Sequence, residues 1–106
     1  MDGLELACFQ LISKAGAAKS LCFESLKYAN EKQFTVAREK ISEAKEIFIE
    51  AHTVHSQLIT KEAQGDSTTV TLLLLHAEDQ LMSAETTRDL IVQMITMYEK
   101  IYELEH

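Results

Sequence analysis

The chain has 106 residues, of which 46% are hydrophobic and 25% are charged, and it contains no proline. This composition predicts a single folded, all-helical domain rather than a disordered chain. The net charge of −7 disfavours nucleic-acid binding, which requires a basic surface, and favours a basic protein partner. No leader pattern or run of about 18 apolar residues occurs, so we expect a cytoplasmic protein without direct membrane insertion.

The first predicted helix spans about residues 3–29. Its apolar or small side chains recur at intervals of three and four residues, which places them on one helix face. They are Leu4, Cys8, Leu11, Ala15, Ala18, Cys22, Leu26 and Ala29. Cys8 and Cys22 lie about 21 Å apart along such a helix, which is too far for a disulfide. We interpret both as small buried hydrophobic residues in a reducing compartment, and we expect Asn30 to close the helix.

The second predicted helix spans about residues 33–63 and has the same spacing of apolar side chains. Its apolar face consists of Phe34, Ala37, Ile41, Ala44, Phe48, Ala51, His55 and Leu58. Gly65 is the expected end signal, because glycine readily adopts the left-handed conformation that follows many helix C-termini. Asp66, Ser67 or Thr68 is the expected N-cap of the next helix.

The third predicted helix spans about residues 68–103 and has two apolar faces. One face is Leu74, Ala77, Leu81, Ala84, Ile91, Ile95 and Tyr98. The other, termed the second stripe, is Leu72, His76, Asp79, Ser83, Thr86, Leu90, Met94, Met97 and Ile101. An antiparallel up-down-up three-helix bundle buries only one face of each helix. We therefore expect self-association to bury the second stripe.

The side chains that could support chemistry form two i, i+3 pairs, His52 with His55 and His76 with Asp79, each on one helix face. His-x-x-His alone is a weak metal signal, and both pairs are also compatible with hydrogen-bonded structural residues. One hypothesis is a metal-binding bundle that uses His52, His55 and Asp79. Another is phosphorylation of His76, because neutral imidazole is a nucleophile and the leucines of residues 72–75 could help a partner exclude water.

Three segments together resemble the IIA component of the lactose/cellobiose (N,N'-diacetylchitobiose) family of the bacterial phosphoenolpyruvate-dependent sugar phosphotransferase system. "VTLLLLHAEDQLM", residues 70–82, is similar to the active-site segment of that family. "LISKAGAAKSLCFESLKYA", residues 11–29, and "FTVAREKISEAKEIFIEAHTVHSQLI", residues 34–59, are similar to its first and second helices. The combination is specific, although each fragment alone is not, and it covers nearly the whole chain.

The resemblance implies a three-helix subunit of a homotrimer. It implies that His76 accepts a phosphoryl group from HPr and passes it to a cysteine of a cognate IIB component. The implied pathway is the uptake of a disaccharide such as lactose, cellobiose or chitobiose, and the resemblance implies that no sugar binds this chain. His52, Glu78 and Gln80 are the implied supporting residues. Asp79 is implied to lie near the trimer axis, where three copies hold a divalent cation, expected to be Mg²⁺.

Three positions depart from the family pattern. Glu78 stands where glutamine is usual, Gln80 where a second histidine is usual, and His55 where glutamine is usual in the second helix. We expect Glu78 to point outward, because a carboxylate beside His76 would slow acceptance of a dianionic phosphate. The alternative hypothesis is a regulatory or scaffolding helical trimer with altered phosphotransfer chemistry. Residues 104–106 resemble a purification-tag remnant and are assigned no function.

Overall fold

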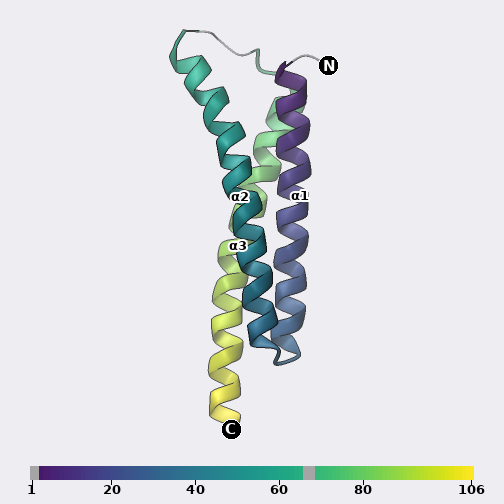
Figure 1. The fold of residues 1–106 in the computed structure, drawn as a ribbon, viewed down its shortest axis with the longest axis vertical. Helices are drawn as coiled ribbons and strands as arrows, with labels where there is room; N and C mark the ends of the chain where they lie inside the picture. Colours follow the sequence, from purple (N-terminus) through teal and green to yellow (C-terminus); the bar gives the residue numbers. More distant parts are fainter. Residues whose placement is uncertain (1–2, 66–68) are drawn as a thin grey trace.

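Three long helices make up the fold (Figure 1). The computed structural model describes residues 3–65 and 69–106, with α1 at Gly3–Asn30, α2 at Phe34–Ala63 and α3 at Leu72–Glu105. α1 and α3 run in the same direction and α2 runs opposite to both, so the predicted up-down-up arrangement is confirmed. The molecule measures 58 × 23 × 20 Å. None of the helices in the described ranges is long and apolar enough to cross a lipid bilayer.

The turn between α1 and α2 is a Schellman motif formed without glycine. α1 ends at Asn30, as expected. The backbone N–H of Gln33 then donates to the carbonyl of Tyr28 at 2.9 Å, and that of Lys32 donates to Ala29 at 3.0 Å. Lys32 has a φ of 66°, the left-handed conformation that this motif requires and that glycine adopts with less strain.

The start of α3 differs from the prediction. α2 ends at Ala63, and Gly65 has the expected left-handed conformation, with a φ of 86°. The predicted N-caps at residues 66–68 lie outside the described residues. α3 begins at Leu72 rather than near residue 68, because Thr71 is its N-cap and its hydroxyl accepts a hydrogen bond from the backbone N–H of Leu74 at 3.1 Å. The β-branched residues 69–71 favour an extended backbone ahead of this cap.

The core lies along α1, because α1 packs extensively against both other helices. α2 and α3 have few contacts with each other. The predicted apolar faces match the buried residues closely. The fully buried set is rich in alanine: Ala15, Ala18, Ala29, Ala37, Ala44, Ala51, Ala77 and Ala84. Small side chains of this kind let helices approach closely. Cys8 and Cys22 are buried and form no disulfide, as predicted, and Ser25 donates a buried hydrogen bond to the Ala37 carbonyl at 2.7 Å.

Polar side chains bridge α2 and α3 where apolar packing is sparse, and we refer to this region as the α2–α3 seam. Polar contacts cross it at successive levels: the Arg38–Glu99 ion pair, and the His52–Glu85 and His55–Glu78 contacts, which are ion pairs when the histidine is protonated. Figure 1 shows α2 leaning away from α3 toward its C-terminal end. Polar side chains therefore connect α2 and α3 at the seam, where interdigitated hydrophobic residues would otherwise pack.

Candidate functional site

His76 lies in the second turn of α3 and is exposed to solvent. The Thr71 cap fixes the first turn of the helix and hence the position of the imidazole along it. Large apolar side chains near His76 are exposed as well, and Leu72 is 84% exposed, with Leu75 and Met82 also on the surface. Leu72 precedes His76 by one turn on the same helix face, and Leu75 and Met82 are on the adjoining side of α3. An accessible imidazole beside uncovered hydrophobic residues can receive a group from a partner that covers the same surface.

His76 projects along the α1 flank of α3. Ser83 follows it by two turns on the same helix face, and Ser83 Oγ accepts a hydrogen bond from Lys19 Nζ of α1 at 3.3 Å. Gln80, one turn after His76, is on this face and is partly buried. The structure therefore places Gln80, but not Glu78, as a neighbour of His76 along the helix.

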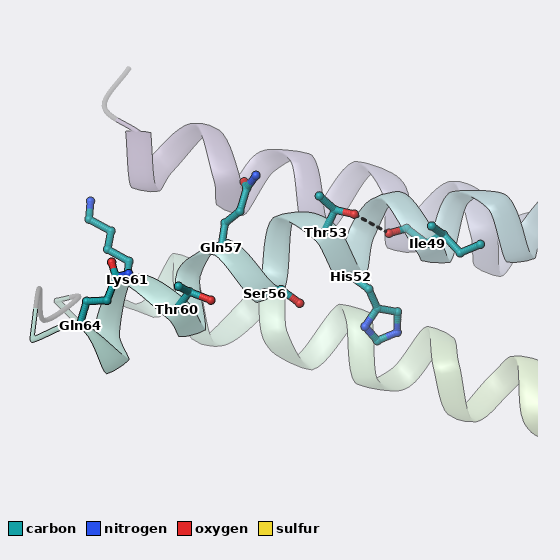
Figure 2. A pocket seen from close by; sticks show the side chains of 8 residues that line it. All are labelled: Ile49, His52, Thr53, Ser56, Gln57, Thr60, Lys61 and Gln64. Carbon is teal, nitrogen blue, oxygen red and sulfur yellow. Dashed lines mark hydrogen bonds between the residues drawn. The ribbon is translucent and has the colours of Figure 1, made fainter.

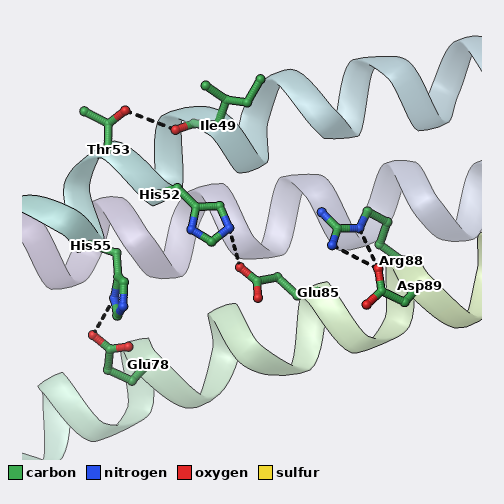
Figure 3. Close-up of polar contacts among 8 residues, drawn as sticks. All are labelled: Ile49, His52, Thr53, His55, Glu78, Glu85, Arg88 and Asp89. Atoms are coloured by element: carbon green, nitrogen blue, oxygen red, sulfur yellow. Dashed lines mark hydrogen bonds and ion pairs between the residues drawn. The ribbon is translucent and has the colours of Figure 1, made fainter.

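Glu78 points toward α2, which corrects the expectation that it points outward. Its Oε1 lies 2.9 Å from His55 Nδ1 (Figure 3). The reason is that His55 lies directly across the α2–α3 seam and supplies a hydrogen-bond donor. Side chains two positions apart on a helix face nearly opposite directions, so the helix itself directs Glu78 away from His76, and the contact with His55 fixes the end of its side chain against α2. Two of the three departures from the family pattern thus contact each other.

His52 also faces the seam, and its partner is Glu85, which the sequence reasoning missed. His52 Nε2 lies 2.7 Å from Glu85 Oε1 (Figure 3), but that buried oxygen has no aligned hydrogen-bond donor among the described residues. The contact is therefore an ion pair when the His52 ring is protonated. Glu85 lies two turns after Glu78 on the same helix face. Two glutamates at this spacing, facing a histidine pair on the neighbouring helix, could have predicted that each histidine has a carboxylate partner.

His52 also borders an open groove of about 640 Å³ on the outer face of α2 (Figure 2). The groove is lined by Ile49, His52, Thr53, Ser56, Gln57, Thr60, Lys61 and Gln64. Every lining residue comes from α2 or, in the case of Gln64, directly follows it, so the groove is a surface depression along one helix and not a cleft between elements. Within a single chain, His52 connects this surface to the seam rather than to His76.

The structure does not support the metal-binding bundle. His52 and His55 engage Glu85 and Glu78 instead of Asp79. No group of three histidine, cysteine, aspartate or glutamate side chains in residues 3–65 and 69–106 is arranged to hold a metal ion. The separation follows from helix geometry, because the seam and the second stripe occupy different sides of α3.

Asp79 lies on the second stripe, one turn after His76, and is exposed. Within the described part of the chain it has neither a hydrogen bond nor an ion pair, and exposed Leu75 and Met82 flank it along the helix. A single carboxylate is a poor site for a divalent cation, but oxygen ligands from several copies suit Mg²⁺. The residue therefore fits a cation only where other copies of the chain converge on it.

The second stripe is exposed along the length of α3, whereas the first apolar face is buried, as predicted. Its large exposed hydrophobic residues are Leu72, Leu90, Met94, Met97 and Ile101. Toward the C-terminal end, Met94, Met97 and Ile101 line a pocket of about 300 Å³ together with Leu26 and Tyr98. The stripe is polar from His76 to Thr86 and apolar from Leu90 to Ile101, and an exposed apolar surface of this kind is typical of a helix that packs against another chain.

Comparison with known proteins identifies the class of protein that this fold and site define. The model of the family described as PTS system, Lactose/Cellobiose specific IIA subunit matches residues 6–99. The chain is 38% identical over 102 residues to the lichenan-specific phosphotransferase enzyme IIA component of Bacillus subtilis (strain 168), covering 96% of this chain and 93% of the relative. The chain therefore belongs to the lactose/cellobiose-specific IIA family of the phosphotransferase system.

Solved structures agree with this assignment. The crystal structure of the PTS cellobiose-specific enzyme IIA from Bacillus anthracis superposes with a TM-score of 0.94 at 38% identity, covering 97% of this chain and 94% of that chain. The solution structure of the IIA(Chitobiose)–HPr complex of Escherichia coli gives a TM-score of 0.83 at 32% identity, with coverages of 96% and 99%. One structural relative has thus been solved together with HPr.

Proposed function

We propose that this chain is a phosphoryl relay that accepts phosphate from phospho-HPr on His76 and donates it to a cysteine of a cognate IIB component. The observation that carries the proposal is the exposed His76 imidazole, with Leu72 exposed one turn before it and Leu75 and Met82 exposed on the adjoining side of α3, in a chain of the IIA family. The solved complex of a relative with HPr supports the choice of donor.

The chemistry requires a neutral ring nitrogen with a free lone pair. That nitrogen attacks the phosphorus of the donor phosphohistidine, so a new N–P bond forms while the donor N–P bond breaks and the donor ring keeps its electron pair. In the second step the IIB thiolate attacks the same phosphorus, an S–P bond forms, and His76 regains its lone pair. A partner that covers His76 together with Leu72 and Leu75 would keep water from intercepting the phosphoryl group.

The partners follow from charge and surface. An exposed apolar rim around His76, on a chain with a net charge of −7, suits a partner with an apolar centre and basic residues at its edge. Nothing in the chemistry requires a sugar to contact this chain, and relatives are named for different saccharides, including lichenan and N,N'-diacetylchitobiose. We propose a cytoplasmic relay that serves the uptake of a disaccharide such as lactose, cellobiose or chitobiose.

We also propose that the chain acts as a homotrimer in which the second stripes meet at a threefold axis. The exposed hydrophobic residues of that stripe would be buried, and three Asp79 carboxylates would converge. Converging carboxylates repel each other unless they are protonated or bridged by a cation. Asp79 would therefore hold a divalent cation, with Mg²⁺ as the expected ion.

The test is incubation with phosphoenolpyruvate, enzyme I and HPr, followed by intact-mass measurement. We expect one acid-labile, base-stable phosphate per chain. The variant His76→Gln should take up none while its helicity is unchanged, because glutamine cannot form the phosphoramidate. The variant His52→Gln should be slower but active. Absence of phosphate from the natural chain, with the same HPr active on another acceptor, would contradict the relay and favour a regulatory or scaffolding trimer.

A further inference from the structure

We infer that His55 is a positioning residue for phosphoryl acceptance, because it holds the Glu78 carboxylate against α2 and away from the face of α3 that carries His76. The inference rests on the proposed function of His76. It goes beyond that function by assigning a role to a residue on a different helix that does not contact the reacting atoms.

The geometry shows a specific tether. His55 Nδ1 and Glu78 Oε1 are 2.9 Å apart across the α2–α3 seam, and the two side chains are only 25% and 32% exposed. Nδ1 donates to the Glu78 carboxylate in the charged ring and in the neutral tautomer that carries its proton on Nδ1. The tether therefore requires a proton on Nδ1 and does not require a charged ring.

No neighbouring group on α2 can replace this donor. One turn after His55 lie Leu58 and Ile59, and one turn before it lies Ala51, none of which offers a side-chain hydrogen bond. His52, the fourth residue one turn away, already contacts Glu85. Without His55, Glu78 would lose its partner at the seam, and its long side chain would turn toward solvent at the end of the molecule where a phosphorylated partner arrives.

A released carboxylate would act against phosphate transfer. Glu78 is two positions from His76 in the chain, and Asp79 already places one negative charge on the second stripe. The incoming phosphoryl group is an anion, and like charges repel more strongly when a docked partner excludes water. We expect loss of the tether to lower kcat/KM for phosphorylation by about three- to tenfold, because a freed Glu78 carboxylate can move toward the incoming anion, and repulsion between charges a few ångströms apart at a protein surface is of this order.

The experiment measures the initial rate of phosphorylation by phospho-HPr in a set of matched variants. His55→Leu keeps the approximate side-chain volume but removes the donor, and should show the three- to tenfold loss. His55→Gln retains a donor and should stay within about twofold of the natural chain. In His55→Leu/Glu78→Gln the charge is gone, so the rate should return to within about twofold. Arg38→Leu removes an ion pair at the far end of the seam and should leave the rate unchanged.

The outcomes separate the inference from the function on which it rests. A purely structural role for His55 would leave His55→Leu/Glu78→Gln as slow as His55→Leu, and that result would overturn the inference. An unchanged rate in His55→Leu would overturn it too. If the natural chain takes no phosphate from active phospho-HPr, the proposed function itself fails and the inference fails with it. Circular dichroism and melting of each variant show whether a slow rate reflects lost fold.

Discussion

Replacing Leu90 with lysine should dissociate the proposed trimer. Leu90 is 56% exposed in the single chain and lies in the middle of the second stripe. Complete burial of a leucine side chain is worth about 1.5–3 kcal/mol, so burying the exposed half contributes about 1 kcal/mol per copy. Three copies would then lose about 3 kcal/mol, which weakens association by a factor on the order of 10². Three ammonium groups at one axis would repel each other and add to this loss.

Sedimentation equilibrium at micromolar concentration is the assay. The natural chain should show about three times the chain mass of 12.0 kDa, and Leu90→Lys should show the single-chain mass. Ile59→Lys is the matched control, because Ile59 is 54% exposed but lies on α2, away from the stripe. That variant should remain a trimer. If Leu90→Lys and the natural chain have the same mass, the second stripe is not the interface.

Three further outcomes are expected. Asp79→Leu should remain trimeric, and a chelator should lower the melting temperature of the natural protein but not of this variant; equal shifts would exclude Asp79 as a cation ligand. Ser25→Ala removes the 2.7 Å hydrogen bond to Ala37 and should lower the free energy of unfolding by about 1 kcal/mol, or about 4 °C in melting temperature, and an unchanged melting temperature would contradict this. Burial raises the pKa of the Cys22 thiol above its ordinary value of 9.0, with Arg88 opposing part of the shift. As pH rises, the thiol ionises in the unfolded chain before it ionises in the folded chain. The contribution of the buried thiol to the free energy of unfolding is therefore complete below the ordinary pKa and is lost as pH rises through the folded pKa. The natural chain should lose stability at alkaline pH relative to Cys22→Ala, and parallel stability–pH profiles of the two proteins would contradict this prediction.

The three helices could be predicted because their buried faces repeat at the helical period without interruption. Two boundaries show where this reasoning stops. Asn30 marked the end of α1, but the left-handed residue of the turn is Lys32, and a lysine gives no sequence signal for a conformation that glycine usually adopts. α3 starts late because the side chain of Thr71 caps it, and a run of β-branched residues does not itself reveal which threonine is the cap.

The candidate site could be predicted only in the part that lies on one helix. The exposure of His76 and of the second stripe follows from spacing along α3. The direction of Glu78 does not, because it depends on His55, which is distant in sequence and is brought opposite by the packing of α2 on α1. Glu85 was missed for the same reason, since its partner His52 also lies on α2.

The polar α2–α3 seam has a consequence for amide hydrogen exchange. Parting α2 from α3 breaks ion pairs but exposes little apolar surface, so this opening should require much less free energy than global unfolding. The last turns of α2, from Ile59 to Ala63, are exposed and should exchange first, whereas α1, packed between its neighbours, should exchange only when the whole chain unfolds. The N-terminal end of α3 lies at this same end of the molecule (Figure 1) and carries His76 in its second turn, so the histidine is close to the part of the protein that opens most readily.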